Sequence, residues 1–539
     1  MGAGRGPAAV PALAPREDPL DDGKPHDHCG IVAMAIDSSA SPARIGKAGP
    51  LKANGVTVTP PPGASAALTA ASPSGNGMGP DVAPLIYYAL QALQHRGQES
   101  CGITTLDGLY ELRTHKAMGL IDQVFDPSII AKLRGRVGIG HTRYSTSAGS
   151  TEENAQPQVV MGASGGIALA HNGNIPNTNE LMDELKAKGW AFYSGNDTEV
   201  VVRLLANKLT KNDGDAVEAI KETMGQLQGS YAFAILIGGE LYAVRDPWAI
   251  KPLCLGRLPN GFMAASESVA LDVVGATFLR DLRPGEVVRI RAAGVETVAE
   301  LPAEKPARCF FEYVYFARPD AYMDGRLNHE VRERIGQVLA REAPAQADIV
   351  VPVPDSGRSH AQGYSEGSGI PYVEALMKNR YVHRTFIMPT QEAREMSVRL
   401  KLNPMRHILE GKRIVLMDDS IVRGTTMKRI VQMCRDAGAK EVHVRIGCPP
   451  IVAPCYLGID MNNRDQLVAA HMPVEDIRQT IGADSLAYIS IPGLVEALRF
   501  AEEELCLGCV TGKYPVQVPG ERTREGKLVP GTPPTVECC

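Results

Sequence analysis

The stretch RIVLMDDSIVRGTTMKRIVQM, residues 413–433, decides the fold of the second half of the chain. An apolar run ends in Asp418 and Asp419, a short polar loop follows, and a helical pattern begins near Thr425. N–H groups at a helix start can bind a phosphate, and Gly424 lets the backbone approach it closely. Open α/β sheets bind ligands at the carboxyl ends of their strands, where the two carboxylates lie. Although an Asp-Asp pair alone also fits a solvated turn, the whole stretch predicts a phosphate site on a parallel sheet.

A second buried strand, ADIVVPVPD at residues 347–355, also runs into a Gly-containing loop and a helical pattern. The two stretches resemble the signatures of type I phosphoribosyltransferases, α/β proteins that bind phosphoribosyl pyrophosphate (PRPP). The resemblance implies that Mg²⁺ and backbone amides stabilise the charge that develops on the leaving pyrophosphate. The residues implied to bind PRPP are Asp355, Ser356, Gly357, Lys401, Asp418, Asp419, Ser420, Arg423, Gly424, Thr425 and Thr426. Those implied to hold Mg²⁺ are Ser356, Asp418 and Asp419.

A basic segment lies between the two phosphate loops, at residues 378–403. Alone it could be a surface helix and loop, but its position indicates a lid over a polyanion. Arg384, Arg399 and Lys401 are its expected phosphate contacts.

The first half is decided by KPHDHCGIVAMAID, residues 24–37, in which Cys29 opens an apolar strand. A buried structural cysteine is a common alternative at such a position. Four further strings combine polar side chains with turn glycines: QHRGQES at 94–100, HTRYST at 141–146, HNGNIPN at 171–177 and SGNDTEV at 194–200. Together and in this order they resemble the glutamine amidotransferase domain of the N-terminal nucleophile class, an α+β fold with αββα layers.

This resemblance implies that Cys29 attacks the glutamine amide, forms a thioester and releases ammonia, with its own α-amine as the base. A free α-amine has a pKa near 8, which suits that role, whereas a peptide nitrogen does not. Residues 1–28 are therefore expected to be a propeptide or a disordered leader. The resemblance also implies an oxyanion hole at Asn172 and Gly173. The implied glutamine-binding residues are Arg96 and Gly97, which frame the nucleophile, Arg143 for the α-carboxylate and Asp197 for the α-ammonium.

Composition along the chain predicts the domain limits. A glutamine amidotransferase domain is expected at 29–295, with a flexible insertion rich in Gly, Ala, Ser and Pro at 38–82. A linker follows at 296–308, and a phosphoribosyltransferase domain at 309–480. The remainder, 481–539, is expected to be a helical segment and a tail.

Both motif sets in one chain resemble the glutamine PRPP amidotransferases of purine synthesis. The implied reaction converts PRPP, glutamine and water into 5-phosphoribosylamine, glutamate and pyrophosphate, with ammonia passing internally. Purine nucleotide inhibitors and a homotetramer or homodimer are implied as well. Two alternatives are a different glutamine-dependent amidotransferase, which would need another acceptor domain, and a PRPP or nucleotide sensor with decayed catalysis. The latter predicts the loss of reactive groups, yet Cys29, Asn172 and Asp418 are present.

Some members of this family carry a 4Fe–4S cluster on four cysteines. Cys455, Cys506 and Cys509 match three ligand positions, but the position expected for the fourth is Val269. A cluster is therefore doubtful from the sequence, with Cys254 as a conceivable substitute. Mg²⁺ is the cofactor expected on the PRPP side.

Charge and composition exclude several other classes. The net charge of −5 gives no global basic surface for nucleic acid, and any phosphate site must be local. No apolar run approaches the roughly 20 residues of a membrane-spanning helix. The 11 cysteines are scattered and no signal peptide precedes them, which indicates a reducing cytoplasm rather than a disulfide framework.

Overall fold

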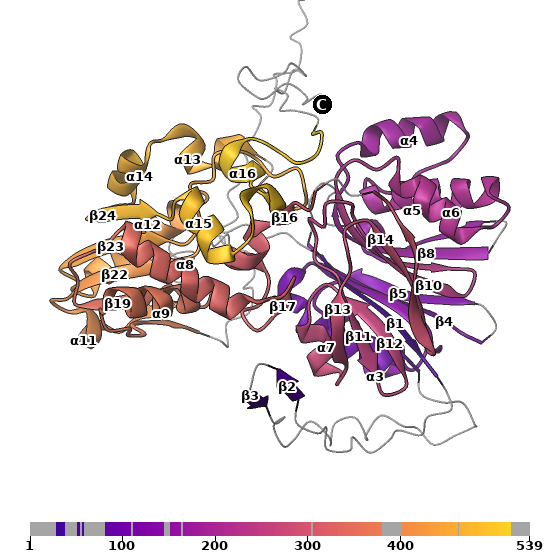
Figure 1. Ribbon diagram of the computed structural model, residues 1–539, viewed down its shortest axis with the longest axis horizontal. Coiled ribbons are helices and arrows are strands. Elements are labelled where there is room, and N and C mark those ends of the chain that lie inside the picture. The colour runs from indigo at the N-terminus through magenta and orange to yellow at the C-terminus, as the bar shows by residue number, and fades with distance from the viewer. Residues whose placement is uncertain are drawn as a thin grey trace, which may run out of the picture.

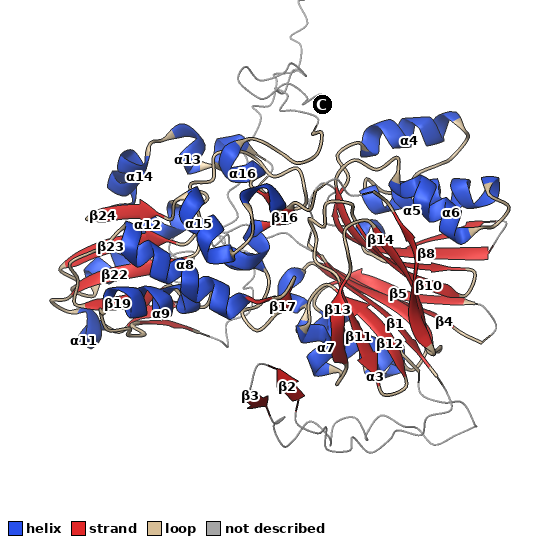
Figure 2. Cartoon of the chain, in the orientation of Figure 1, coloured by secondary structure: helices blue, strands red, loops and turns tan. Residues whose placement is uncertain are grey.

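The computed structural model describes ten parts of the chain: residues 29–37, 51–53, 56–58, 81–108, 111–144, 151–162, 165–302, 305–379, 402–461 and 463–518. An α+β domain and an α/β domain lie side by side (Figure 1), the first with antiparallel strands and the second built on a parallel sheet (Figure 2). No helix in these ranges is long and apolar enough to cross a membrane.

The first domain contains two antiparallel sheets packed face to face. The first sheet has the order β13-β11-β12-β1-β6-β4-β5 and the second β15-β14-β10-β9-β8-β7. The strands of the first are β1 (Gly30–Ile36), β4 (Ser100–Leu106), β5 (Leu112–Met118), β6 (Val137–Arg143), β11 (Cys254–Leu258), β12 (Gly261–Ala265) and β13 (Thr277–Asp281). Those of the second are β7 (Gln158–Gly162), β8 (Gly165–Asn174), β9 (Ser230–Ile237), β10 (Glu240–Arg245), β14 (Glu286–Arg291) and β15 (Gly294–Glu300).

Helices cover the outer faces of both sheets, which confirms the predicted αββα layers. Helices α1 (Ala83–Ala92) and α7 (Val269–Val273) pack at the first sheet, and α4 (Thr178–Ala187), α5 (Asp197–Lys211) and α6 (Ala216–Met224) at the second. The alternation along β1 explains this arrangement. Ile31 and Ala33 join the core between the sheets, while Val32 and Met34 join the core on the α1 side. Because both faces of β1 are buried, its sequence is apolar throughout.

The second domain has a parallel sheet, β19-β22-β23-β24, as predicted. Its strands are β19 (Ile349–Pro352), β22 (Arg413–Asp418), β23 (Glu441–Ile446) and β24 (Ser485–Tyr488). Helices α8 (Asn328–Glu342) and α9 (Gly357–Ser368) pack on each other, as do α12 (Thr425–Asp436) and α14 (Val474–Ile481), and α15 (Ile491–Leu498) packs on α8. Shorter elements are α2 (Ile121–Val124), α3 (Pro127–Ile130), β20 (Leu376–Lys378), β21 (Leu402–Pro404), α11 (Arg406–Leu409), α13 (Val468–His471) and α16 (Gly508–Thr511).

The segment that joins the domains is structured. A π-helix covers Glu312–Phe316, and the short strand β16 (Arg308–Cys309) pairs in parallel with β25 (Leu505–Cys506) near the other end of the described chain. The hairpin β17 (Tyr322–Met323) and β18 (Arg326–Leu327) follows.

The structure differs from the sequence-based limits at three places. β15 extends to Glu300, so residues 296–300 are strand rather than linker; its polar edge-strand composition concealed it. β24 adds residues 485–488 to the parallel sheet, beyond the expected limit at 480. Within the insertion expected at 38–82, the structure describes the hairpin strands β2 (Leu51–Ala53) and β3 (Val56–Val58), and Val82 is fully buried beside α1.

Candidate active sites

Cys29 lies directly before β1, with its side chain buried. β1 pairs with β6 so that Gly30 is opposite Thr142, which places Cys29 at the end of β6. Its carbonyl oxygen accepts a hydrogen bond from Nε of Arg96 at 3.2 Å. Its thiol forms no disulfide within the described residues.

Asn172 and Gly173 lie near the end of β8, in the sheet that faces β1 and β6. Asn172 is fully buried, and neither Oδ1 nor Nδ2 has a hydrogen-bond partner within the described residues. Leaving such atoms unpaired costs about 1–3 kcal/mol, so a hydrogen bond from either atom to a substrate would be favourable. Gly173 has φ +148°, and a Cβ there would lie 2.0 Å from the carbonyl oxygen of Ser230. A buried, unpaired side-chain amide next to a glycine with positive φ is an arrangement that can form an oxyanion hole.

The two sheets are linked at this point by His141 of β6. Its Nε2 lies 2.9 Å from the carbonyl oxygen of His171 on β8. Burial lowers the pKa of His141 to about 3, so the ring is neutral. Because a carbonyl only accepts, Nε2 must carry the proton.

Arg143 is the last residue of β6 and is buried, with Nη1 3.7 Å from Oε2 of Glu99. Gly97 packs against its backbone, where a Cβ would lie 2.6 Å from the Arg143 nitrogen. Because Gly97 has no side chain, the chain at residue 97 can pass close to the backbone of Arg143 at the end of β6.

Asp197 is the first residue of α5, and its Oδ2 accepts the N–H of Ile175 at 3.2 Å. Burial alone would raise the pKa of Asp197, but the interaction with His171 at 3.5 Å and several hydrogen bonds lower it. A buried carboxylate held ionised in this way can bind an ammonium group.

Arg96 has partners that the sequence analysis did not anticipate. Its guanidinium binds Glu267 through Nη1 and Glu312 through Nη2 at 2.8 Å, and all three side chains are buried. Burial alone would raise the pKa of Glu267, but His95 and Arg96 lower it below its usual range. Glu267 lies in the sequence ASESVALD at 265–272, and Glu312 in FEYVYFARPD at 311–320. A charged residue inside each of these apolar stretches was the available signal.

In the second domain, the two phosphate loops leave neighbouring strands at the same edge of the sheet. β19 and β22 are parallel neighbours with Pro352 opposite Met417. Gly357, at the start of α9, lies so close to β22 that a Cβ would be 2.5 Å from the Met417 carbonyl oxygen. The structure therefore brings residues 355–357 beside Asp418.

Asp418 and Asp419 are both buried at the end of β22. The Asp419 N–H donates to Oδ1 of Asp418 at 2.9 Å, and the Ser420 hydroxyl donates to Oδ2 of Asp419 at 2.6 Å. Gly424 has φ +78° and caps α12, whose first residues are Thr425 and Thr426.

Other predicted residues lie further out or outside the described ranges. Arg423 donates to Oε1 of Gln466 at 2.6 Å, and Asp355 pairs with Arg358 at 2.9 Å and Lys378 at 3.2 Å. Ser356 is the residue before α9. Lys401, Arg384 and Arg399 lie outside the described residues, as do residues 1–28.

No group of three or more His, Cys, Asp and Glu side chains in the described ranges is arranged to hold a single metal ion. Mg²⁺ is usually bound by one or two carboxylates together with substrate phosphates, so Asp418 and Asp419 fit it without a closed protein cage.

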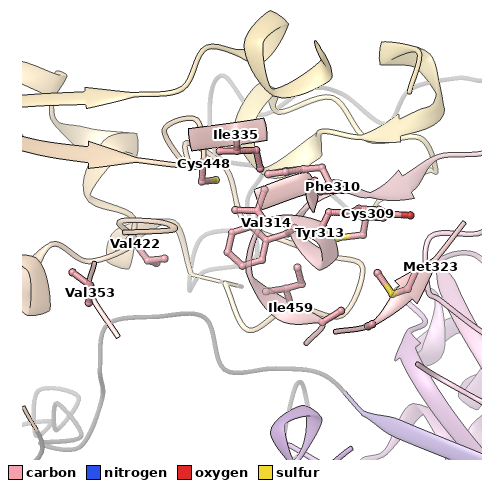
Figure 3. Close-up of a cluster of buried hydrophobic side chains, with 14 of the residues drawn as sticks. Cys309, Phe310, Tyr313, Val314, Met323, Ile335, Val353, Val422, Cys448 and Ile459 are labelled. Carbon is pink, nitrogen blue, oxygen red and sulfur yellow. The ribbon is translucent and has the colours of Figure 1, made fainter. Parts of the chain in front are cut away.

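A cysteine that the sequence analysis missed completes a set of four. The pairing of β16 with β25 places Cys309 opposite Cys506. The carbonyl of Cys509 accepts the N–H groups of Val452 and Ala453, close to Cys455. Burial raises the pKa of the Cys509 thiol, and the neighbouring thiols, Cys455, Cys448, Cys309 and Cys506, raise it further. Figure 3 shows Cys309 and Cys448 within this buried region.

Cys254 and Val269, the positions considered for the fourth ligand, lie elsewhere. The Cys254 thiol donates to the Ala265 carbonyl on β12, and Val269 begins α7. Cys309 directly follows the expected linker at 296–308, and this position was the available signal.

Comparisons with known proteins match both halves of the chain. The glutamine amidotransferase domain family matches residues 141–273, and the phosphoribosyl transferase domain family matches residues 323–448. The amidophosphoribosyltransferase of Methanocaldococcus jannaschii is 50% identical over 82% of this chain and 96% of its own length. The chain belongs to the amidophosphoribosyltransferases.

Further members of this family agree. The amidophosphoribosyltransferase of Bacillus subtilis is 44% identical over 82% of this chain and 93% of its own length. A solved structure described as the allosteric regulatory enzyme of purine biosynthesis superposes with a TM-score of 0.78 at 39% identity, covering 93% of this chain and 98% of its own. The glutamine PRPP amidotransferase of B. subtilis, solved with ADP and GMP, superposes with a TM-score of 0.76 at 42% identity, covering 83% and 97%.

Proposed function

We propose that this amidophosphoribosyltransferase transfers the amide nitrogen of glutamine to PRPP, giving 5-phosphoribosylamine, glutamate and pyrophosphate. The observation that carries the proposal is that one chain combines two sets of residues. Cys29 lies directly before β1, and the unpaired amide of Asn172 lies on β8 of the facing sheet. The buried carboxylates Asp418 and Asp419 lie at a phosphate-binding loop.

In the first half-reaction, Cys29 attacks the glutamine amide carbon. The Asn172 side chain and the N–H of Gly173 donate to the developing oxyanion. The guanidinium of Arg143 pairs with the glutamine α-carboxylate, and Asp197 with its α-ammonium. Arg96 and Gly97 frame the nucleophile. The C–N bond breaks and the amide nitrogen leaves as ammonia, which gives the thioester. Water then cleaves the C–S bond to give glutamate and the free thiol.

In the second half-reaction, ammonia displaces pyrophosphate from the ribose C1′. Asp418 and Asp419 face the ribose hydroxyls and a PRPP-bound Mg²⁺, and residues 420–426 hold the 5′-phosphate. The loop at Asp355, Ser356 and Gly357 receives the pyrophosphate.

The test compares two nitrogen sources. We expect purified enzyme to form pyrophosphate from PRPP with either glutamine or ammonium chloride, and Cys29→Ala to lose the glutamine-dependent reaction alone. A catalytically decayed sensor would form no pyrophosphate with either source, and a different amidotransferase would consume glutamine without consuming PRPP.

We further propose that residues 1–28 are removed, because Cys29 needs a free α-amine as its base. Intact mass spectrometry of the purified protein tests this. A mass that begins at Cys29 supports the proposal, whereas an uncleaved chain with full glutaminase activity contradicts it.

A 4Fe–4S cluster fits Cys309, Cys455, Cys506 and Cys509, because four cysteines are the usual ligands and such a cluster is larger than a single ion. The cluster would supply a covalent link between the domain junction and the C-terminal segment. We expect anaerobically purified protein to contain about four irons and four sulfides per chain. Cys309→Ser should abolish this content, and Cys434→Ser, a buried cysteine in α12, should not.

Purine nucleotides are proposed as inhibitors, supported by the ADP and GMP bound to the B. subtilis relative. A homotetramer or homodimer is proposed from the family resemblance. Inhibition assays with GMP and ADP, and light scattering of the purified protein, test these two proposals.

A further inference from the structure

Three side chains of the first domain donate hydrogen bonds to three consecutive carbonyls of the second. Asn174 donates through Nδ2 to Tyr456 at 2.8 Å, and the Ser230 hydroxyl donates to Leu457 at 2.8 Å. Lys251 donates through Nζ to Gly458 at 3.2 Å. We name residues 456–458 the docking loop. Because the three acceptors are consecutive along the backbone, the loop is held in a defined register.

The docking loop lies directly against the candidate oxyanion hole. Asn174 is the residue after Gly173 on β8, and Ser230 is its partner on β9. Gly458 has φ +91°, and a Cβ there would lie 2.9 Å from the carbonyl carbon of Gly173 and 3.1 Å from its oxygen. The two glycine backbones are therefore in direct contact, which any other residue at position 458 would disturb.

The third donor, Lys251, is fully buried. Burying an ammonium group is costly unless it is well hydrogen-bonded. Its bond to Gly458 crosses the domain boundary, and its charge also acts on the thiols of Cys309 and Cys455. Such a group makes the docking specific, because a displaced loop would leave a buried charge with fewer partners.

The far side of the docking loop is anchored to the C-terminal segment. Val452 and Ala453 donate to the Cys509 carbonyl at 2.9 and 3.0 Å, and the Tyr514 hydroxyl donates to the Pro454 carbonyl. Ile459, the next residue after the loop, packs among buried side chains that include Cys309 and Tyr313 (Figure 3). The loop is thus fixed from both sides.

We propose that the docking loop positions Gly173 for catalysis, which makes Asn174, Ser230 and Lys251 positioning residues for glutamine hydrolysis. The inference rests on the proposed glutaminase function. A glycine with φ +148° has no Cβ to restrain it, yet an oxyanion donor must be held within about 0.5 Å of its productive position. Contact with Gly458 supplies that restraint. A domain that binds no glutamine thereby completes the glutaminase site.

The test uses the aldehyde analogue of glutamine, in which a CHO group replaces the amide. In water this aldehyde is in equilibrium with the cyclic imine formed with its own α-amine and loss of water, so only ratios of inhibition constants between variants are compared. The Cys29 thiol adds across the aldehyde C=O: sulfur bonds to carbon, the thiol proton balances the oxygen, and no group leaves. The resulting oxygen occupies the oxyanion hole, so the inhibition constant reports the position of Gly173 without turnover. The variants are Asn174→Asp and Ser230→Ala in the full processed chain. Asn177→Asp is the matched control, because its amide donates at 2.9 Å to Gln226 within the first domain.

Removing an oxyanion donor costs about 100- to 1,000-fold in kcat, so we expect loosened positioning to cost about tenfold. Both variants should raise the aldehyde inhibition constant and lower the glutaminase kcat by that factor. The KM for glutamine and the ammonia-dependent synthesis should stay unchanged, which separates positioning from misfolding. Inhibition constants within twofold of the parent, in a parent that hydrolyses glutamine, would overturn the role of the loop. A parent that does not hydrolyse glutamine would overturn the proposed function and this inference together.

Discussion

The guanidinium of Arg96 donates from Nε to the carbonyl oxygen of Cys29 at 3.2 Å while its other nitrogens bind two buried glutamates. Glu267 comes from the first domain, and Glu312 from the π-helix that joins the domains. The ring of Phe316, from the same π-helix, lies 4.9 Å from the guanidinium carbon. The position of the nucleophile is therefore coupled to the domain junction through one side chain.

Substitution of Arg96 is expected to impair glutamine use and stability separately. Arg96→Lys keeps the charge but cannot reach three partners, and misplacing Cys29 by about 1 Å would lower glutamine-dependent kcat about 100-fold. Ammonia-dependent activity should persist. Arg96→Ala removes the one guanidinium that pairs with both buried carboxylates, which should lower the free energy of unfolding by about 3–5 kcal/mol. Kinetics with both nitrogen sources and urea unfolding measure these effects.

Arg113 provides the control for Arg96, because it pairs with Asp107 through a partly exposed side chain. Arg113→Ala should change the free energy of unfolding by no more than about 1 kcal/mol. Equal losses from the two alanine variants would contradict the special role of Arg96.

Gly97→Ala is expected to weaken glutamine binding. The new Cβ would meet the backbone nitrogen of Arg143 at 2.6 Å, so the end of β6 must shift. Because Arg143 is the proposed partner of the α-carboxylate, KM for glutamine should rise about tenfold or more, the equivalent of 1.4 kcal/mol. Gly108→Ala is the control, since nothing lies within 4 Å of its Cβ position. An unchanged KM would show that Arg143 does not depend on this approach.

Asp418→Asn and Asp419→Asn are expected to abolish phosphoribosylamine synthesis with either nitrogen source. Each removes a carboxylate that we propose binds PRPP and its Mg²⁺, so we expect losses of at least about 100-fold. Hydrolysis of glutamine without PRPP should continue, because Cys29 lies in the other domain. Asp436→Asn, at the exposed end of α12, should leave both activities intact. If Asp418→Asn and Asp419→Asn still synthesise phosphoribosylamine, PRPP must bind at another site.

The two motif sets could be predicted because each combines a local pattern with a chemical requirement. The strand, the loop and the start of the helix all lie within the 21 consecutive residues 413–433, so the pattern could be recognised in one stretch of sequence. The structure has a strand at Arg413–Asp418 and a helix that begins at Thr425, as predicted. Contacts between distant segments gave no such local signal. Cys309 meets Cys506 only because β16 pairs with β25, and Asn174 meets Tyr456 across 282 positions. Such partners depend on how the domains pack, which periodicity does not encode.

Stability should fall with rising pH because of Asp281, at the end of β13. Burial, with the nearby Asp324 carboxylate, raises the pKa of Asp281 to about 7, while Asp324 is bound by Arg245 and the Tyr313 hydroxyl. The unfolded pKa is near 3.9, so between about pH 4 and pH 7 the folded state holds the extra proton. Its stabilising effect is complete below pH 4 and lost as pH rises through 7.

In the parent, Oδ2 of Asp281 accepts a hydrogen bond from the backbone N–H of Asp324 at 2.9 Å. Asp281→Asn removes the titrating carboxyl group but keeps an amide oxygen that can accept the same hydrogen bond. We therefore expect the variant to be more stable than the parent at pH 8 by about 1–2 kcal/mol, with a smaller difference at pH 5. Urea unfolding midpoints at both pH values measure this. Asp183→Asn, an exposed carboxylate on α4, is the control and should shift neither midpoint. If the parent and Asp281→Asn lose stability equally between pH 5 and pH 8, another buried group carries the pH dependence, and the Asp281–Asp324 contact does not sense pH.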